Sequence, residues 1–329
     1  MCEPAPPFRQ SGLLTRRFLA RAAGALALSP VCAFADPSSD KGPVAARNIE
    51  GRLSIQVRVD GKGPFGFIVD SGAERSVIAS ELAGALALPR GKSVLLRDIA
   101  RSIPTETARV DELVTGRVRL RRAELPVLPR NWIGADGYLG LDVIDGHKLV
   151  LDFARGAMTL GDPRPQASQI RRPDEAVIKA GGAHGKLTAI DCSVDRVGVA
   201  AFLDTGAEVS VGNTRLLNSL ASRGSFNAGG EMVRISGVTG GSLDCPLVKL
   251  SHLTLPELEF KDCAIAIADL QIFDIWGLSK RPALLIGMDL LRQFAEVTMD
   301  YGRKEYRFVM GEDGPARLRP GGSGSLGWT

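Results

Sequence analysis

The sequence is poor in residues that several classes of protein need. Only three of its 329 residues are histidine, and only 5% are aromatic. Because there is also no G-x-S-x-G motif, a Ser–His hydrolase and a histidine-rich metal site are both disfavoured. Gly61–Gly66 matches G-x-G-x-x-G, but Pro64 and a strand-like continuation favour a hairpin turn over a dinucleotide site. We expect no metal and no cofactor.

Cysteine and long apolar runs are also scarce. Of the five cysteines, Cys2 and Cys32 lie near the amino terminus, and Cys192, Cys245 and Cys263 lie in the second half. They lack the C-x-x-C spacing of zinc sites, and the last three allow at most one disulfide. No apolar stretch approaches the roughly 20 residues of a spanning helix, so we expect no membrane span.

The net charge of +4 comes mostly from the amino terminus. Residues 1–35 contain Arg16 and Arg17, an apolar run at Ala22–Leu28, and a small-x-small pattern at Ala33–Ala35. This order of features predicts an export signal that resembles the bacterial twin-arginine type, with an ordinary secretory signal as the alternative. We therefore expect a periplasmic or secreted protein. Removing the signal leaves a charge near zero, which argues against a nucleic-acid partner.

A chain of this length and composition is expected to form about two domains of roughly 100–200 residues each. When the sequence is shifted by 134 residues, Gly51–Val77 aligns without gaps on Gly185–Val211, with eight identical positions. Chance would give roughly two identities. Two later segments also repeat, namely Tyr138–Ile144 with Leu285–Leu291 and Leu149–Phe153 with Glu296–Tyr301. The chain therefore contains a duplicated unit.

The repeat and the composition of the connecting segments set the expected boundaries. These are an export signal at 1–35, an N-terminal lobe at 36–162, a linker at 163–173, a C-terminal lobe at 174–311 and a flexible tail at 312–329.

Within each half the pattern is mostly β, so the predicted fold class is all-β with two similar lobes. Predicted hairpins join Val114–Leu120 to Ala123–Leu128 and Leu247–Leu255 to Leu258–Ile267. Arg117, Arg119, Arg121 and Arg122 fall in the first of these, where alternation indicates a solvated face rather than a nucleic-acid patch. Short helices are expected at Ala79–Leu88, Thr214–Ala221 and Asp289–Phe294.

The centre of each repeat is an apolar strand that runs into Asp-Ser/Thr-Gly-Ala. The two copies are Phe67–Ala73, which contains Asp70, and Phe202–Ala207, which contains Asp204. A charge at the end of a buried strand is costly unless it is paired, so the duplication suggests that the two carboxylates meet. Two carboxylates about 3 Å apart share one proton. Such a pair provides a base for water and an acid for a carbonyl oxygen.

These motifs resemble the aspartic protease superfamily, in particular its retropepsin-like branch, over about residues 48–310. An apolar-apolar-Gly element in each half, Tyr138–Gly140 and Leu285–Gly287, adds to the resemblance. It implies an exported aspartic endopeptidase acting on peptides or proteins. It also implies two β-barrel lobes related by a pseudo-twofold axis within one monomeric chain. The alternatives are a peptide-binding protein of this fold that does not cut, and a dimer in which each lobe pairs with another chain.

The resemblance assigns roles position by position. Asp70 and Asp204 would form the catalytic pair. The supporting positions are Ser71, Gly72 and Ala73 in the first half and Thr205, Gly206 and Ala207 in the second. There the hydroxyls would bond between the lobes and the glycines would permit a tight turn. Ala rather than Ser follows each Asp-x-Gly, and we expect a working pH nearer neutral than that of pepsin-like enzymes.

Further residues are assigned to substrate binding or to structure. Glu74 and Glu208 stand where retropepsins often carry an Asp that binds the substrate backbone, although a surface or inter-lobe ion pair is equally compatible. A Gly-tipped flap is predicted at Val233–Gly241, with Gly237, Val238, Thr239 and Gly240 at its tip. The matching segment Leu95–Thr107 lacks the Gly tip, so the cover is expected to be asymmetric. The repeated Asp142 and Asp289 are expected to be structural.

Overall fold

The computed structural model describes most of the chain after the amino-terminal segment. The described residues are 47–49, 52–98, 102–163, 171–182, 187–224, 227–311 and 316–319. The predicted export signal lies outside them, as do most of the predicted linker and tail. Among the described residues, no helix is long and apolar enough to cross a membrane. Cys192, Cys245 and Cys263 form no disulfide there.

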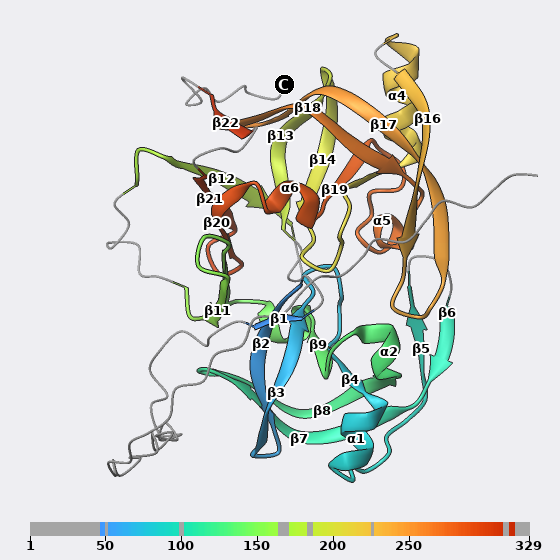
Figure 1. Ribbon diagram of the computed structural model, residues 1–329, viewed down its shortest axis with the longest axis vertical. Helices are drawn as coiled ribbons and strands as arrows, with labels where there is room; N and C mark the ends of the chain where they lie inside the picture. The colour runs from blue at the N-terminus through green and yellow to red at the C-terminus, as the bar shows by residue number, and fades with distance from the viewer. Residues whose placement is uncertain are drawn as a thin grey trace, which may run out of the picture. The chain divides into compact units, whose positions relative to one another are not determined.

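The first half forms a barrel of six strands, closed because β7 pairs back onto β2 (Figure 1). In ring order the strands are β2 (Arg52–Val59), β3 (Lys62–Val69), β9 (Gly137–Leu139), β4 (Val77–Ala79), β8 (Val118–Leu128) and β7 (Thr107–Thr115). Alternation explains the barrel wall, because Ile55, Val57 and Val59 are fully buried while Arg58 between them is exposed. The helices of this half are α1 (Ser80–Ala85), α2 (Arg130–Ile133) and α3 (Leu141–Ile144).

The second half forms an equivalent six-stranded barrel, closed by pairing of β13 with β17. Its ring order is β13 (Thr188–Val194), β14 (Val197–Leu203), β19 (Ala283–Ile286), β15 (Val211–Gly212), β18 (Leu258–Ile267) and β17 (Ser242–Leu255). Its helices are α4 (Thr214–Ser222), α5 (Gln271–Ile275) and α6 (Met288–Leu291). The Asn213 side chain accepts a hydrogen bond from the Leu216 amide at 2.9 Å, which starts α4 at the predicted place.

Other strands lie outside the two barrel rings. They are β1 (Arg47–Ile49) on β2, β16 (Asn227–Ser236) on β17, β22 (Ala316–Leu318) on β18, and the separate pair β5 (Val94–Arg97) with β6 (Ser102–Thr105). The structure confirms the all-β class with two similar barrels.

A further sheet joins strands from both halves. Its order is β11 (Ala157–Gly161), β10 (Lys148–Asp152), β20 (Phe294–Asp300), β21 (Glu305–Met310) and β12 (Glu175–Gly181). The strands β10 and β20 are the repeated segments found in the sequence, and they pair antiparallel with Val150 opposite Thr298. These two residues are equivalent in the repeat, so the pseudo-twofold axis passes between them.

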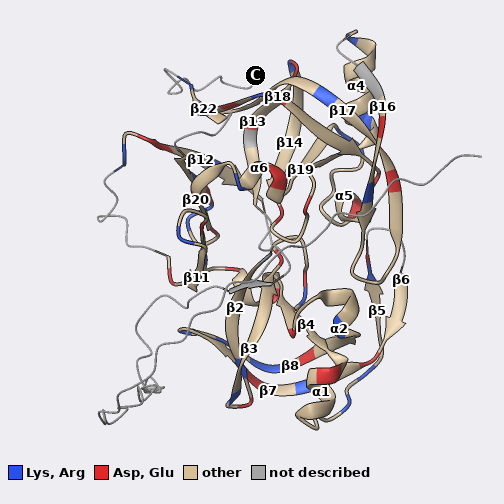
Figure 2. Cartoon of the chain, in the orientation of Figure 1, with Lys and Arg blue, Asp and Glu red and all other residues tan. Residues whose placement is uncertain are grey.

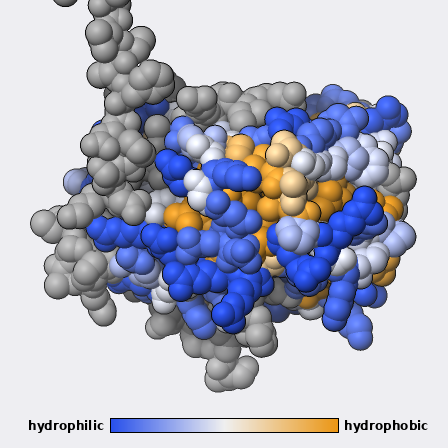
Figure 3. Space-filling model, turned by 90° about the horizontal axis from the view of Figure 1, so that it is seen from below, coloured by the Kyte–Doolittle hydropathy of each residue, from blue (hydrophilic) through white to orange (hydrophobic). Residues whose placement is uncertain are grey.

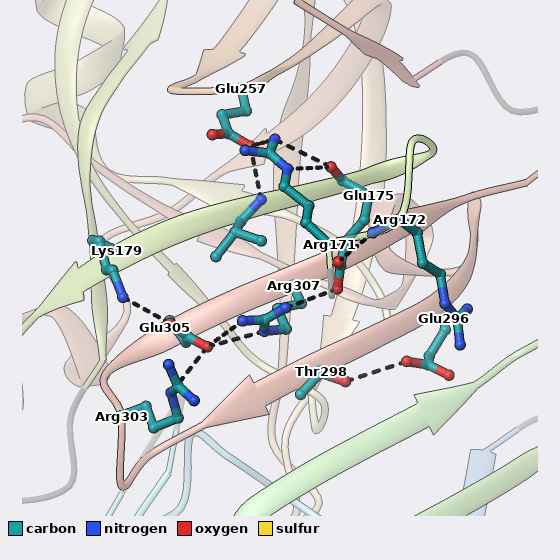
Figure 4. A network of polar contacts seen from close by, with 11 residues as sticks. Arg171, Arg172, Glu175, Lys179, Glu257, Glu296, Thr298, Arg303, Glu305 and Arg307 are labelled. Carbon is teal, nitrogen blue, oxygen red and sulfur yellow. Dashed lines mark hydrogen bonds and ion pairs between the residues drawn. The ribbon is translucent and has the colours of Figure 1, made fainter. Parts of the chain in front are cut away.

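Charged side chains form a network on β12, β20 and β21 (Figure 4). The buried carboxylate of Glu305 accepts hydrogen bonds from Lys179 at 2.7 Å and Arg307 at 2.9 Å. Burial opposes ionisation of Glu305, but these two cations lower its pKa. Arg307 also reaches Glu175 at 3.1 Å. The network therefore ties β12 to β21 by charge as well as by backbone pairing.

The turn of the first predicted hairpin was placed incorrectly. Strand β7 ends at Thr115 and β8 begins at Val118, so the turn lies at Gly116 rather than near Arg121. Gly116 has a φ of 55°, which glycine adopts without strain. Arg122 also has a positive φ, 52°, but it lies inside β8. The turn signal that we placed there therefore corresponds to an irregularity within a long strand.

The surface is mostly polar. Figure 2 shows basic residues along β8. Arg119 and Arg121 of this strand lie 3.3 and 3.1 Å from the Glu112 carboxylate. Their exposed positions fit the predicted solvated face. Figure 3 shows one largely hydrophilic face with an apolar patch in its middle. Among the described large apolar side chains, only Leu95, Met232 and Leu318 are more than about a third exposed.

Candidate active site

Asp70 and Asp204 stand at the ends of two equivalent buried strands. Asp70 follows β3 and its amide donates to the Leu139 carbonyl at 2.9 Å, while Asp204 follows β14 and its amide donates to the Ile286 carbonyl at 2.9 Å. Each acceptor belongs to the strand that pairs in parallel with the Asp-bearing strand. The same backbone geometry therefore presents one aspartate from each barrel.

The glycines after the aspartates bring the two carboxylates together. The Gly72 amide donates to Asp70 Oδ1 and the Gly206 amide to Asp204 Oδ1, each at 2.9 Å. A Cβ atom on Gly72 would overlap the Asp204 carboxylate, and a Cβ on Gly206 would overlap that of Asp70. Each turn thus lies against the aspartate of the other barrel. The structure brings together the two residues that the repeat had singled out.

Asp204 is set up to hold a proton. Its side chain is buried, and burial together with the charge of Asp70 raises its pKa well above the ordinary value. A side-chain hydrogen bond with Asp70 acts in the same direction, because it needs a proton on one of the two groups. Amides of Gly206 and Gly72 oppose the shift without cancelling it. The pair therefore favours the state that carries a single proton.

Ser71 and Thr205 exchange hydrogen bonds between the barrels. The Ser71 amide donates to Thr205 Oγ1 at 3.1 Å, and the Thr205 amide donates to Ser71 Oγ at 3.0 Å. Ser71 Oγ donates onward to the Leu203 carbonyl at 3.1 Å, and Thr205 Oγ1 to the Val69 carbonyl at 2.7 Å. Both side chains are buried, so these bonds fix the two aspartate turns against each other.

A repeated Ser–Asp pair supports each turn from behind. Asp142 Oδ1 accepts from Ser76 Oγ at 2.6 Å, and Asp289 Oδ1 accepts from Ser210 Oγ at 2.7 Å. The serine hydroxyls in turn accept from the Gly140 and Gly287 amides, at 3.0 and 2.9 Å. Asp142 and Asp289 thus hold the apolar-apolar-Gly element to the aspartate turn, which agrees with the structural role that we expected. The serines were missed, although their place in the repeat could have revealed them.

Tyr301 is a second residue that sequence reasoning missed. Its side chain is buried and interacts with Ser71, and burial raises the pKa of its hydroxyl. The hydroxyl therefore stays neutral beside the aspartate pair. The equivalent residue in the first half is Phe153, so this contact exists on one side of the pseudo-twofold axis only.

The two glutamates that follow the turns are exposed. Glu208 Oε2 lies 3.2 Å from an Arg292 nitrogen, which makes a surface ion pair in the second barrel. Glu74 is exposed in the first barrel. Their predicted contact with a substrate backbone remains a prediction.

A hairpin extends from each half. In the second, the β16–β17 turn contains Gly237, Val238, Thr239 and Gly240, and Val238 packs partly buried against the core. In the first, β5 and β6 pair as a hairpin although no glycine marks its tip. Asp98, directly after β5, accepts hydrogen bonds from Thr239. Residues 99–101, between β5 and β6, lie outside the described residues, so the expected asymmetry of the cover stays a prediction.

Two equivalent barrels that present facing aspartates from Asp-Ser/Thr-Gly turns define a protein of the aspartic protease type. A family model described as aspartyl protease matches residues 55–143 and 190–290, together more than half of the chain. The chain belongs to this family. Each matched region contains one aspartate turn with its Ser–Asp support, and membership supports a protease-like function. No curated protein matches the sequence closely enough to count as a relative.

Proposed function

We propose that this protein is an aspartic endopeptidase in which Asp70 and Asp204 activate one water molecule against a peptide bond. One observation carries the proposal: the two carboxylates interact directly in a buried setting that favours a single shared proton. Asp70 Oδ1 accepts from the Gly72 and Ala73 amides at 2.9 and 3.1 Å, which stabilises its charged form. This makes Asp70 the base and Asp204 the acid.

The proposed reaction has two steps. In the first, the Asp70 carboxylate takes a proton from water while the water oxygen bonds to the peptide carbonyl carbon, and Asp204 gives its proton to the carbonyl oxygen. In the second, Asp70 passes its proton to the amide nitrogen and a hydroxyl of the tetrahedral intermediate returns a proton to Asp204. The carbon–nitrogen bond then breaks. The products are a carboxylic acid and an amine, and the pair regains its starting protonation.

The working pH follows from the proton on Asp204. Because its pKa is raised, the singly protonated pair persists toward neutral pH. Ala73 and Ala207 carry no hydroxyl that could donate to the pair and help hold it ionised at low pH. We therefore expect activity to extend toward neutral pH. A sharp maximum below about pH 3.5, under the ordinary carboxyl range, would contradict this.

A peptide-library assay tests the proposal. The mature chain is incubated with the library over acidic and neutral pH, with and without the inhibitor pepstatin. Asp70→Asn and Asp204→Asn should abolish cleavage while leaving circular dichroism unchanged, and Asp111→Asn, an exposed carboxylate on β7, should cleave normally. Full cleavage by either dyad variant would refute the mechanism. Binding of peptides without cleavage by the unaltered chain would favour the peptide-binding alternative.

We further propose that the protein is exported and acts in the periplasm or outside the cell. The support is the sequence of residues 1–35, with its paired arginines, apolar run and small-x-small end. Fractionation of cells expressing the full chain, followed by determination of the mature amino terminus, tests this. The expected terminus is Asp36, and an unprocessed cytoplasmic chain would contradict the proposal.

A further inference from the structure

A carboxylate at the end of β5 in the first hairpin binds the turn of the second hairpin. Asp98 Oδ2 accepts hydrogen bonds from the Thr239 amide at 2.9 Å and from Thr239 Oγ1 at 2.7 Å. The two residues are 141 positions apart and belong to different halves of the chain. Thr239 is fully buried although it lies in the turn of a hairpin, where side chains are ordinarily exposed. The contact with the first hairpin therefore defines the position of the second tip.

The backbone of the turn around Thr239 directs the Thr239 amide away from its own hairpin. The Gly237 amide donates to the Gly241 carbonyl at 2.8 Å, and the Gly240 amide donates to the Gly237 carbonyl at 3.1 Å. These bonds satisfy the turn internally, and the Thr239 amide is directed at the opposite half instead. The approach is close, because a Cβ atom on Gly237 would overlap the Asp98 carboxylate. Gly237 has no left-handed φ, so glycine is needed here for space.

The charge of Asp98 makes this contact stronger than an ordinary turn bond. Hydrogen bonds to an ionised acceptor are shorter and roughly twice as strong as those between neutral groups. The second hairpin is also braced at its stem, where Arg234 binds Asp244 through two bonds of 2.8 and 2.9 Å. This pair joins β16 to β17 beside the turn, so loss of the bonds to Thr239 is expected to free the turn without separating the two strands.

We propose that Asp98 is a positioning residue that latches the two hairpins together when no substrate is bound. Opening of the hairpins requires the two bonds to Thr239 to break. The proposal rests on the proposed function only in regarding the hairpins as the cover of the aspartate pair. A peptide would enter after the latch opens, and the latch would set the fraction of time that the cover stays closed.

Hydrogen exchange detected by mass spectrometry tests the latch. The variants Asp98→Ala, Asp98→Asn and Gly237→Ala are compared with the parent chain, all in the Asp70→Asn background. Asp98→Ala should accelerate exchange of the amides at 236–242 at least tenfold, the ratio for a loss of about 1.4 kcal/mol. Gly237→Ala should do the same by displacing the carboxylate. Asp98→Asn should fall between, because its amide oxygen still accepts.

The decisive result is that a substitution at Asp98 in the first half changes hydrogen exchange at 236–242 in the second half. A residue that only supports its own hairpin would change exchange at 94–105 and leave 236–242 alone. Asp111→Ala, an exposed carboxylate on β7, is the matched control and should change neither region. If exchange at 236–242 stays within twofold of the parent in both Asp98→Ala and Gly237→Ala, the latch is refuted. Should Asp98→Ala fail to fold, Gly237→Ala decides alone.

The outcome is independent of catalysis. Because every variant carries Asp70→Asn, the measurement does not require the protein to cut anything. A protein that shows the exchange effect but never hydrolyses peptides would support the latch and refute the proposed function. The opposite combination would refute the latch and leave the endopeptidase proposal standing.

Discussion

Gly72 and Gly206 each face the carboxylate of the opposite barrel. Neither has the positive φ that would require glycine for the backbone alone. Their constraint is space, because a methyl group at either position would overlap an aspartate. At the scale of single residues, the two carboxylates can therefore lie close together only because Gly72 and Gly206 carry no side chain.

Gly206→Ala should separate the aspartate pair. The added methyl group displaces Asp70, and we expect activity to be lost and the free energy of unfolding to fall by about 1–3 kcal/mol, the usual cost of overpacking. Thermal unfolding and the peptide assay measure the two effects. Gly198→Ala is the matched control, since a Cβ there meets no atom within 4 Å. Normal activity of Gly206→Ala would show that the two turns can move apart without consequence.

Asp204→Asn should stabilise the protein at neutral pH. The folded chain keeps a proton on Asp204 that the unfolded chain releases above about pH 4, so the free energy of unfolding falls as pH rises from there toward the raised pKa. Asparagine binds no proton in either state, so this loss of unfolding free energy with rising pH disappears. We expect a gain of about 1–3 kcal/mol at neutral pH and little difference below pH ~4, by denaturant unfolding. An equal effect at both pH values would mean that ionisation of Asp204 is not the cause.

The sequence located the dyad but not all of its supports. Asp70 and Asp204 stand out because a charged residue ends an apolar strand twice, and burial of a charge is costly enough to need a reason. Tyr301 does not stand out, because a buried tyrosine at a core position matches any hydrophobic pattern. Asp98 also leaves no pattern, because its partner Thr239 is distant in sequence and follows from tertiary structure alone.

At the scale of helices and strands, a Ser–Asp pair that occurs once in each half holds the aspartate turn to a short helix. Asp289 accepts from the Ser210 amide at 3.0 Å and hydroxyl at 2.7 Å, so it joins the start of α6 to the turn that carries Asp204. Asp142 does the same for α3 and Asp70. The side chains of Asp142 and Asp289 therefore fix the turns that carry Asp70 and Asp204 relative to the wall of each barrel.

Asp289→Ala should loosen one turn only. Loss of the acceptor leaves the Ser210 amide and hydroxyl unsatisfied, and we expect a cost of about 2–4 kcal/mol with a sharp fall in activity. Asp289→Asn should be milder, because its oxygen still accepts. Urea unfolding measures the cost, with Asp274→Ala, exposed on α5, as control. A cost for Asp289→Ala no larger than that of Asp274→Ala would exclude the supporting role.

Element prediction failed where a local signal was ambiguous. The hairpin of β7 and β8 turns at Gly116, but the arginines that follow this glycine hide the turn in the sequence pattern. The turn between β17 and β18 was predicted correctly because Pro256 and Glu257 interrupt two apolar runs. The pair β5–β6 lacks a glycine tip, yet backbone pairing formed it regardless. The absence of a glycine at the turn therefore does not exclude a hairpin.

The whole molecule is organised around the pairing of β10 with β20. Each strand comes from one copy of the repeat, and the residues opposite each other at the centre, Val150 and Thr298, are repeat equivalents. The sequence revealed the duplication, but not that β10 pairs with β20, because strand partners distant in sequence are chosen by tertiary contacts.

The mature chain should be a monomer in solution. The strand edge that a lone half would offer to another copy is already occupied, since β10 lies between β11 and β20. Sedimentation at micromolar concentration should give the mass of one mature chain at any salt concentration. Val150→Pro, which removes a ladder donor, should lower stability in a single transition that involves both halves. A stable dimer of the unaltered chain would favour pairing between chains.

Because both halves belong to one chain, the contact between Asp98 and Thr239 need not be self-complementary. In a symmetric dimer a contact between two different residues is made twice, once from each subunit, so the contacting surface must complement a copy of itself. Here a donor and an acceptor face each other because the two copies have diverged. A duplicated chain can therefore change one side of this contact without changing the other, which an assembly of identical subunits cannot do.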